Sequence, residues 1–456
     1  MESKVKDILR RIRNEAAAKG IQASFLYHHE KSHLMRIGNN SVSLSTSEEL
    51  TRLDIEIING KRQGSHTQLG EVISEEYVRE ALELAVQKAE VANEKSYQPI
   101  FAKIEETVIQ EDQYDEALEN LDPSFKAEGY KQIFDKIGNH YNFSGSWSSG
   151  STEYFMMTTA NENEVYRRGT DQLFNVVLKH PEKRWELSSS QTGYRKSDFC
   201  VDATVAEFSK LSEIYEKYEG NYITPGEYTV VLGAQALAEV MEMAIWTGLS
   251  GAGYEEKRGW TAGKNFGDVI LGENITITDK PDNDLTYKFA FDLFGLKRNE
   301  FPLIENGKFS NLIYDSTTAA KYGKQVTSQN VNGTSITMMT GSGAECIKDE
   351  VKGMGKVLFI PALHYINLPN PNKGIFTGSS RFNAVLIEDG EVKGPIFSSR
   401  ITDSFASVFG KVKVISSKMV SVNLSNTYGR RSPVAAAVPS YIVSEKVKIT
   451  DCAESF

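Results

Sequence analysis

The feature that most constrains the fold is a change of pattern near residues 221–227, where Thr224-Pro225-Gly226 places turn-forming residues directly after a predicted helix. Before this point, helical segments alternate with groups of strands, and after it short strand-like segments dominate. The chain has 456 residues, which is more than the roughly 250–300 residues that a single hydrophobic core supports. We therefore expect two domains, residues 1–222 and residues 223–456.

The N-terminal half contains two stretches with the same order of predicted elements: a helix, several strands and a second helix. The first stretch has a helix over Val5–Lys19, short strands near 23–27, 34–37, 42–46 and 53–58, and a helix that Ser74 caps. The second stretch begins at the helix-start signal Asp122-Pro123 and closes with an amphipathic helix before Gly220. The acid-rich segment 105–119 between them is interpreted as a solvated linker. We expect two helix–strands–helix units.

The C-terminal half begins with a predicted strand over Tyr228–Leu232 and a predicted helix over Ala234–Thr247. After this helix, short β segments alternate with Gly, Asn and Pro turns, which predicts a mostly β domain. The fold class is therefore predicted to be α+β, with helices and antiparallel strands in the first domain and mainly strands in the second.

Composition limits the compartment and the partners. The net charge of −10 and the pI of about 5.4 argue against direct contact with nucleic acid, which requires clustered Lys and Arg. The most apolar stretch, Val230–Ala238, is far shorter than the ~20 residues that a membrane-spanning helix needs. Cys200, Cys346 and Cys452 lie far apart, which is typical of reduced thiols. We expect a cytoplasmic protein with no membrane or nucleic-acid partner.

The sequence His29-Glu30-Lys31-Ser32-His33 matches HExxH, a pattern that binds zinc when it lies on a helix. Strand-like segments flank it on both sides, and a strand does not direct His29 and His33 to one ion. Residues 259–264 resemble a phosphate-binding loop but are one residue short, so we interpret them as a turn. His364, the one histidine of the second half, is interpreted as an ordinary strand or loop residue.

The second half also carries a series of short motifs in a fixed order. They are Phe291-Asp-Leu-Phe-Gly-Leu296, Ile304-Glu-Asn-Gly-Lys-Phe309, Gly374-Ile-Phe-Thr-Gly378, Val385-Leu-Ile-Glu-Asp-Gly-Glu391, Arg431-Ser-Pro-Val434 and Val438-Pro-Ser-Tyr-Ile442. Together these motifs resemble the TldD/PmbA family, also called modulators of DNA gyrase. The turn Ile58-Asn-Gly-Lys-Arg62 extends the resemblance into the first half. The resemblance implies a peptide-maturation metallopeptidase scaffold.

In the catalytic TldD branch, the resemblance implies a helix with HExxxH, in which two histidines bind zinc, a glutamate acts as base, and a C-terminal cysteine adds a ligand. Aligned on Val230–Gly233 and Gly248–Gly251, the two histidine positions fall on Glu242 and Thr247, and the glutamate position falls on Met243. A shift by one residue selects Met241, Glu242 and Trp246 instead. The cysteine position falls on Ser425. Neither alignment retains an imidazole, so we expect no metal, no cofactor and the PmbA (TldE-like) branch.

The resemblance thus implies a metal-free subunit, not catalytic alone, that assists proteolysis or maturation of unfolded peptides with a TldD-like partner. Two alternatives remain open. The chain is an active metallopeptidase with unorthodox ligands, Glu242 with His364 or the group His28, His29 and His33. Otherwise it is a stand-alone homodimer that binds an extended peptide by strand addition. Any effect on gyrase is expected to be indirect, because the chain is acidic.

Overall fold

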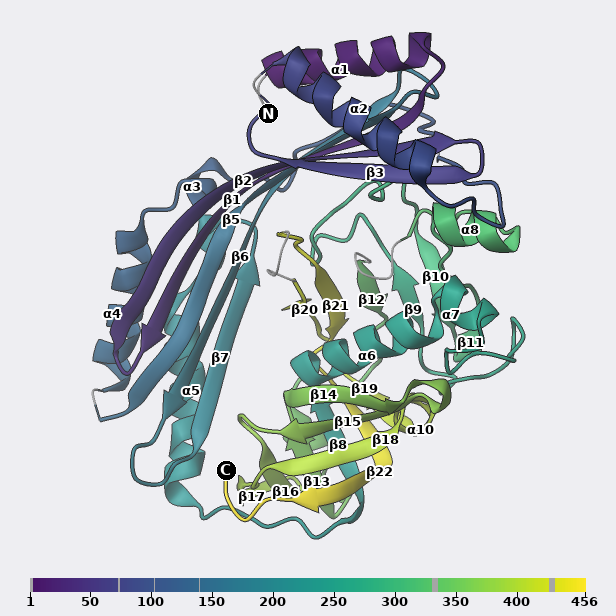
Figure 1. Ribbon diagram of the computed structural model, residues 1–456. Coiled ribbons are helices and arrows are strands. Elements are labelled where there is room, and N and C mark those ends of the chain that lie inside the picture. The colour runs from purple at the N-terminus through teal and green to yellow at the C-terminus, as the bar shows by residue number, and fades with distance from the viewer. Residues whose placement is uncertain (1–2, 73, 102, 139, 330–334, 426–430) are drawn as a thin grey trace.

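The computed structural model describes residues 3–72, 74–101, 103–138, 140–329, 335–425 and 431–456. The N-terminal half forms a long curved sheet with helices on its outer side, and the C-terminal half lies against the inner side of that sheet (Figure 1). The predicted α+β class, with a mostly β second half, is confirmed. Within the described residues, no helix is both long enough and apolar enough to cross a membrane.

The N-terminal sheet has seven strands in the order β3-β2-β1-β5-β6, with β4 and β7 both paired to β6. All neighbours are antiparallel except β4, which runs parallel to β6. The strands are β1 (Gln22–Gly38), β2 (Ser41–Asn59), β3 (Arg62–Leu69), β4 (Val108–Gln110), β5 (Asn142–Thr158), β6 (Glu164–Lys179) and β7 (Glu186–Gly193). Strands from both predicted helix–strands–helix units therefore join in one sheet.

The prediction of four short strands between residues 23 and 58 is wrong, because β1 and β2 each run without a break. The alternation of apolar residues stops at residues 28–33, where the side chains are polar. The outward side chains of this stretch lie between two helix-covered ends of the sheet, beside a cavity of about 300 Å³ that His29 and Lys31 line. They face water and not a core, so the strand continues without apolar residues there.

Helices cover both ends of the outer face. They are α1 (Ser3–Ala18), α2 (Glu75–Val91), α3 (Glu116–Glu119), α4 (Pro123–Ile137), the short 3₁₀ helix η1 (Lys196–Asp198) and α5 (Val201–Lys217). The predicted caps are confirmed, since Ser74 Oγ accepts a hydrogen bond from Tyr77 N at 3.2 Å and Asp122 Oδ1 accepts one from Ser124 N at 2.7 Å. The helices α1 and α2 pack on one end of the sheet, and α4 and α5 pack on the other.

The acid-rich segment 105–119 is only partly the solvated linker that its composition predicts: Glu105, Glu106, Glu111, Asp112 and Glu116 are exposed, but other parts of it are ordered against the sheet. Its residues 108–110 form β4, and Glu119 is only 4% exposed. Burial alone would raise the pKa of Glu119, but hydrogen bonds from Ser151 and Tyr114 and the charge of Arg168 hold that pKa at about 2. A buried carboxylate is stable here because each of its oxygens accepts hydrogen bonds.

The C-terminal half contains two sheets. One has the order β11-β10-β9-β12-β21-β20, and the other has the order β14-β15-β18-β22-β8-β13-β16-β17, with β19 also paired to β22. The strands are β8 (Gly226–Gly233), β9 (Ile277–Asp279), β10 (Phe301–Glu305), β11 (Lys308–Phe309), β12 (Ile336–Met338), β13 (Lys356–Ile360), β14 (Leu363–Asn370), β15 (Ile375–Ser380), β16 (Val385–Glu388), β17 (Glu391–Pro395), β18 (Ser399–Ser404), β19 (Val412–Ile415), β20 (Met419–Asn423), β21 (Ala435–Pro439) and β22 (Tyr441–Cys452).

Short helices connect these strands, and one longer helix lies between the two sheets (Figure 1). They are α6 (Ala234–Gly248), α7 (Gly251–Glu255), α8 (Ser316–Tyr322), α9 (Ile347–Glu350), η2 (Pro371–Lys373) and α10 (Phe405–Gly410). The strand and helix predicted at 228–232 and 234–247 correspond to β8 and α6. Residues 259–264 form turns, as predicted.

Buried polar contacts join the two halves of the chain. Arg431 lies between β20 and β21 in the chain. Its guanidinium donates two hydrogen bonds to the carboxylate of Asp171 on β6, at 2.8 and 2.6 Å. The backbone N–H of Arg431 donates to Glu30 Oε2 on β1 at 2.6 Å. Asn383 bonds both backbone groups of Ser188 at the outer edge of β7. These contacts hold the C-terminal sheets against the inner face of the N-terminal sheet.

Candidate functional site

The helix α6 begins directly at the end of the central strand β8. Its N-cap is Gly233, where an added Cβ would lie 2.7 Å from Pro361 Cα, so only glycine allows the chain to pass this closely. At the other end, a Cβ at Gly248 would lie 2.0 Å from Trp260 Nε1, which donates to Ala244 O at 2.8 Å. The sequence thus fixes both ends of α6 against neighbouring segments.

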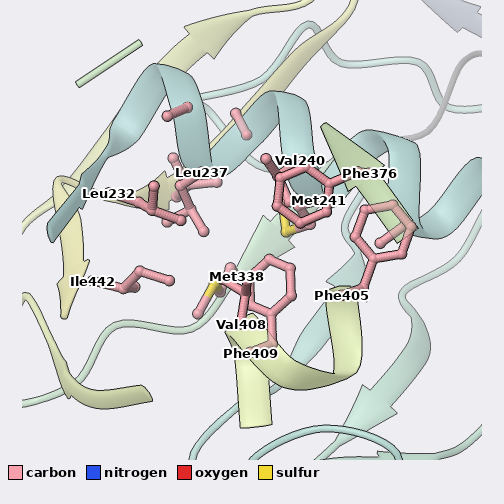
Figure 2. Packing of buried hydrophobic residues seen from close by; sticks show 14 of the residues in the cluster. Leu232, Leu237, Val240, Met241, Met338, Phe376, Phe405, Val408, Phe409 and Ile442 are labelled. Carbon is pink, nitrogen blue, oxygen red and sulfur yellow. The ribbon is translucent and has the colours of Figure 1, made fainter. Parts of the chain in front are cut away.

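One face of α6 is part of the largest hydrophobic core of the C-terminal half. Leu237, Val240 and Met241 are fully buried, and Figure 2 shows them with Phe376 and Phe405. The remaining face carries Gln235, Glu239 and Glu242, which are half-buried, and Trp246, which is 49% exposed. This polar face is the part of α6 that is available for chemistry or binding.

The four positions aligned with the family's metal site are Glu242, Met243, Thr247 and Ser425, and each side chain contacts residues close to it in the fold. Glu242 is half-buried on the polar face, and burial raises the pKa of its carboxyl. Met243 packs against the core, and Thr247 Oγ1 donates to Met243 O at 2.7 Å within the helix. Ser425 follows β20, a strand that packs against α6, and its hydroxyl bonds both backbone groups of Val434. No hydrogen bond between described residues links Ser425 to α6.

The positions that the two alignments select differ in burial. Met241 is 0% exposed and points into the core among Val240 and Phe376 (Figure 2). A metal ligand at position 241 would therefore face apolar side chains and no solvent. Position 242 lies on the polar face, whereas Met243 beside it packs against the core.

The donor atoms at these positions do not suit zinc. Protein zinc sites use thiolate, imidazole and carboxylate ligands, usually three or four together. Of the four aligned residues only Glu242 has such a group, because Met243 offers a thioether, and Thr247 and Ser425 offer hydroxyls that already bond backbone atoms. Across the described parts of the chain, no three His, Cys, Asp or Glu side chains are grouped to hold a metal ion.

Glu239 is a site residue that the sequence interpretation missed. It lies one turn before Glu242 on the polar face, and Gln235 Nε2 donates to its Oε1 at 2.6 Å. Burial raises the pKa of Glu239 to about 7; the Gln235 hydrogen bond opposes this shift, and the nearby Glu242 carboxylate adds to it. The available sequence signal was two acids three residues apart in an otherwise apolar helix. This carboxyl group can act as donor or acceptor near neutral pH.

The HExxH sequence lies within the continuous strand β1, where the sequence predicts an interval between two short strands, and its members point to opposite faces of the sheet. His29 and His33 are on the outer face, where they bond Glu49 Oε1 at 2.9 Å and Ser47 Oγ at 2.8 Å. Glu30 is on the inner face and accepts from Arg431 N. Residues four apart in a strand are about 13 Å apart, so His29 and His33 do not meet at one ion. His28 also faces inward, where its ring stacks on Tyr154.

His364 lies on β14, the edge strand of the nine-stranded sheet, and α6 packs beside this strand. Its Nδ1 is 3.3 Å from Arg381 Nη1, and Arg381 forms an ion pair with Glu186 on β7. Burial and the Arg381 charge lower the pKa of His364. No hydrogen bond or ion pair between described residues joins His364 to Glu242. His364 therefore belongs to the contact between the two halves of the chain.

Comparison with known proteins extends these observations. Residues 225–451 match the family model described as the PmbA/TldA metallopeptidase C-terminal domain. An uncharacterised protein of Methanocaldococcus jannaschii is 32% identical over 111 residues. That match covers 24% of this chain and 24% of the relative, so the chain matches about a quarter of the relative's length.

The whole chain is similar to solved structures. TldE from Thermococcus kodakarensis is 19% identical with a TM-score of 0.80, and the alignment covers 98% of this chain and 100% of TldE. A Thermotoga maritima protein, described as a candidate modulator of a DNA gyrase, is 15% identical with a TM-score of 0.80 over the same shares. The matched C-terminal domain, together with the TldE-like fold of the whole chain, shows that this protein belongs to the TldD/PmbA family.

Proposed function

We propose that this protein is a peptide-binding subunit, not catalytic alone, that works with a TldD-like partner in the proteolysis or maturation of unfolded peptides. The observation that carries the proposal is the state of α6. The helix keeps its close contacts at Gly233 and Gly248, yet positions 242, 243 and 247 present no imidazole. A retained scaffold without the ligands of a metallopeptidase favours a supporting role over independent catalysis.

The polar face of α6 and the edge of β14 together suit an extended peptide. Because β14 is the last strand of its sheet among the described residues, its outer edge can pair with an added strand. Glu239 and Glu242 lie on the adjacent helix face and can accept hydrogen bonds from peptide N–H groups or attract a basic side chain. Backbone pairing does not depend on sequence, which suits a subunit that receives unfolded peptides.

The cytoplasmic location remains part of the proposal. Cys200 and Cys346 are exposed free thiols, and Cys452 is a buried one. Free exposed thiols are typical of proteins that function in a reducing compartment. The net charge of −10 supports the expectation that nucleic acid is not a direct partner.

Affinity purification of the tagged full chain from its native host, followed by mass spectrometry, tests the partner. We expect a TldD-like chain with an intact HExxxH motif to be enriched in near-equal amount. An unrelated tagged cytoplasmic protein from the same host is the control for non-specific capture. Recovery of the tagged chain without any such partner would contradict the subunit proposal.

Elemental analysis of the purified chain distinguishes this proposal from an active metallopeptidase with unorthodox ligands. We expect far less than one zinc per chain, because no three His, Cys, Asp or Glu side chains of the described residues are grouped to hold an ion. Stoichiometric zinc would overturn the proposal. In that case Glu242→Gln and His364→Ala would show which side chain holds the metal, with His66→Ala on β3 as the matched control.

A further inference from the structure

The outer face of the N-terminal sheet carries a cavity of about 300 Å³, which side chains of α1 and α3 border. This volume is at the lower end of the range of small-molecule pockets. The floor of the cavity crosses the strands β2, β1, β5 and β6 in a row made by Thr51, His29, Glu153 and Arg168. Lys31 lies two residues beyond His29 on the same face of β1, opposite Glu49. Charged side chains of both signs therefore line one small cavity.

Two of the four acids that line the cavity are already paired within the protein. Oxygens of Glu119 and Glu153 lie 2.9 and 3.1 Å from nitrogens of the Arg168 guanidinium. Glu119 also accepts hydrogen bonds from Ser151 Oγ and from the Tyr114 hydroxyl, both at 2.6 Å. Both acidic side chains are only 5% exposed. They form a fixed part of the wall, and their charge is balanced mainly by the protein's own groups.

The wall also carries charges of both signs that the described chain does not pair. Lys31 lies opposite Glu49, but Glu49 Oε1 is 2.9 Å from His29 Nε2 instead. Neither the Lys31 ammonium nor the Glu71 carboxylate forms a hydrogen bond or an ion pair with another described residue. Lys31 is half-buried, and a partly desolvated ammonium group is stabilised by a bound anion. The cavity therefore suits a carboxylate at Lys31 and a cation at Glu49 and Glu71.

Apolar side chains form another part of the wall. Val5 on α1 and Val72, which precedes α2, are 9% and 6% exposed and line the cavity. Charges of both signs beside an apolar surface match a small zwitterion that has an apolar group. A phosphorylated ligand matches less well, because four carboxylates line the cavity and only Lys31 and Arg168 among the lining residues carry a fixed positive charge. A wholly apolar ligand would desolvate these charges without pairing them.

We propose that this cavity binds one free α-amino acid with an apolar side chain. The carboxylate of the ligand accepts hydrogen bonds from Lys31 Nζ, and its ammonium group donates to Glu49 and Glu71. The side chain of the ligand packs against Val5 and Val72. This inference does not depend on the proposed role in peptide handling, because the cavity lies on the outer face of the sheet and the C-terminal half, which contains α6, lies against the inner face (Figure 1).

Isothermal titration calorimetry of the full chain with L-leucine, L-methionine and L-valine tests the ligand class. We expect at least one of the three to bind with a Kd below about 1 mM. The N-acetyl and amide derivatives of the tightest binder each lack one of its two charges, so each should bind about tenfold more weakly. If none of the three amino acids binds, or if both derivatives bind as tightly as the parent amino acid, the proposal is wrong.

A lysine variant tests whether the amino acid binds in this cavity. Lys31→Met keeps the length of the side chain but removes its ammonium group, so we expect it to weaken binding of the amino acid about tenfold. It should leave binding of the amide derivative unchanged, because that derivative has no carboxylate to lose a partner. Lys210→Met, on the exposed surface of α5, is the matched control and should bind both as the wild type does.

Circular dichroism verifies that both lysine variants fold. Unchanged binding of the amino acid by Lys31→Met would contradict the placement of its carboxylate. An equal loss of affinity in Lys210→Met would show that the effect does not come from this cavity.

The two carboxylates test the orientation of the ligand independently. Glu49→Gln/Glu71→Gln removes both negative charges, while the amide oxygen at position 49 can still accept a hydrogen bond from His29. We expect this variant to weaken binding of the amino acid and to leave binding of its N-acetyl derivative unchanged, because that derivative has no ammonium group. If the variant binds the amino acid as tightly as the wild type, or weakens both compounds equally, the ammonium group does not lie at these carboxylates and the proposed orientation is wrong.

Discussion

Replacing Asp171 by alanine should lower the free energy of unfolding by about 3–5 kcal/mol, because the Arg431 guanidinium would remain buried without its carboxylate. Both side chains are 4% exposed, and the two hydrogen bonds between them measure 2.6 and 2.8 Å. Water cannot replace the lost partner without separating the two halves of the chain. Urea unfolding of the wild type and Asp171→Ala, followed by circular dichroism, measures the difference.

An exposed ion pair provides the matched control. Lys393 Nζ and Glu391 Oε2 are 2.7 Å apart, but their side chains are 38% and 78% exposed. Glu391→Ala should leave stability nearly unchanged, because water solvates the remaining ammonium group. Asp171→Ala/Arg431→Met should recover part of the loss, since it removes the unpaired charge as well. A loss below about 1 kcal/mol for Asp171→Ala would show that the Arg431 charge has another means of stabilisation.

The Arg431–Asp171 contact also shows where sequence reasoning ends. The helices with clear start signals, such as those at Ser74 and Asp122, were predictable because the capping groups are local in sequence. Arg431 and Asp171 are 260 residues apart, and nothing local to either residue indicates the other. The buried Glu119 was missed for the same reason, since its partner Arg168 lies on a distant strand.

The helix that carries the candidate site was predictable, but the environment of its side chains was not. The sequence pattern predicts α6, and the resemblance assigns the positions Glu242, Met243 and Thr247 to it. The resemblance could not indicate that Met241 faces the core while Glu242 lies on the polar face. It also passed over Glu239, because the family motif assigns no role to that position and only the packing around α6 makes its carboxyl unusual.

Replacing Glu239 by glutamine should stabilise the protein at pH 8 and have almost no effect at pH 4. The pKa of Glu239 is raised from its ordinary value of 4.5 to about 7, mainly by burial. Below pH 4.5 the carboxyl is protonated in both the folded and the unfolded state. Between pH 4.5 and 7 the unfolded chain releases the proton while the folded chain retains it, so the carboxyl increasingly favours unfolding. The penalty reaches at most about 3 kcal/mol above pH 7.

Glutamine removes that penalty because it is neutral at every pH and can still accept the hydrogen bond from Gln235 Nε2. Urea unfolding of the wild type and Glu239→Gln at several pH values between 4 and 8 measures the effect. Glu391→Gln is the control: the Lys393 hydrogen bond lowers the pKa of Glu391, so this variant should show no gain as pH rises. Glu242→Gln should show a gain of the same sign as Glu239→Gln, since burial also raises the pKa of Glu242. If the stability difference between Glu239→Gln and the wild type does not change with pH, the prediction is wrong. Glu239 would then ionise as freely in the folded chain as in the unfolded one, and the polar face of α6 would be open to water.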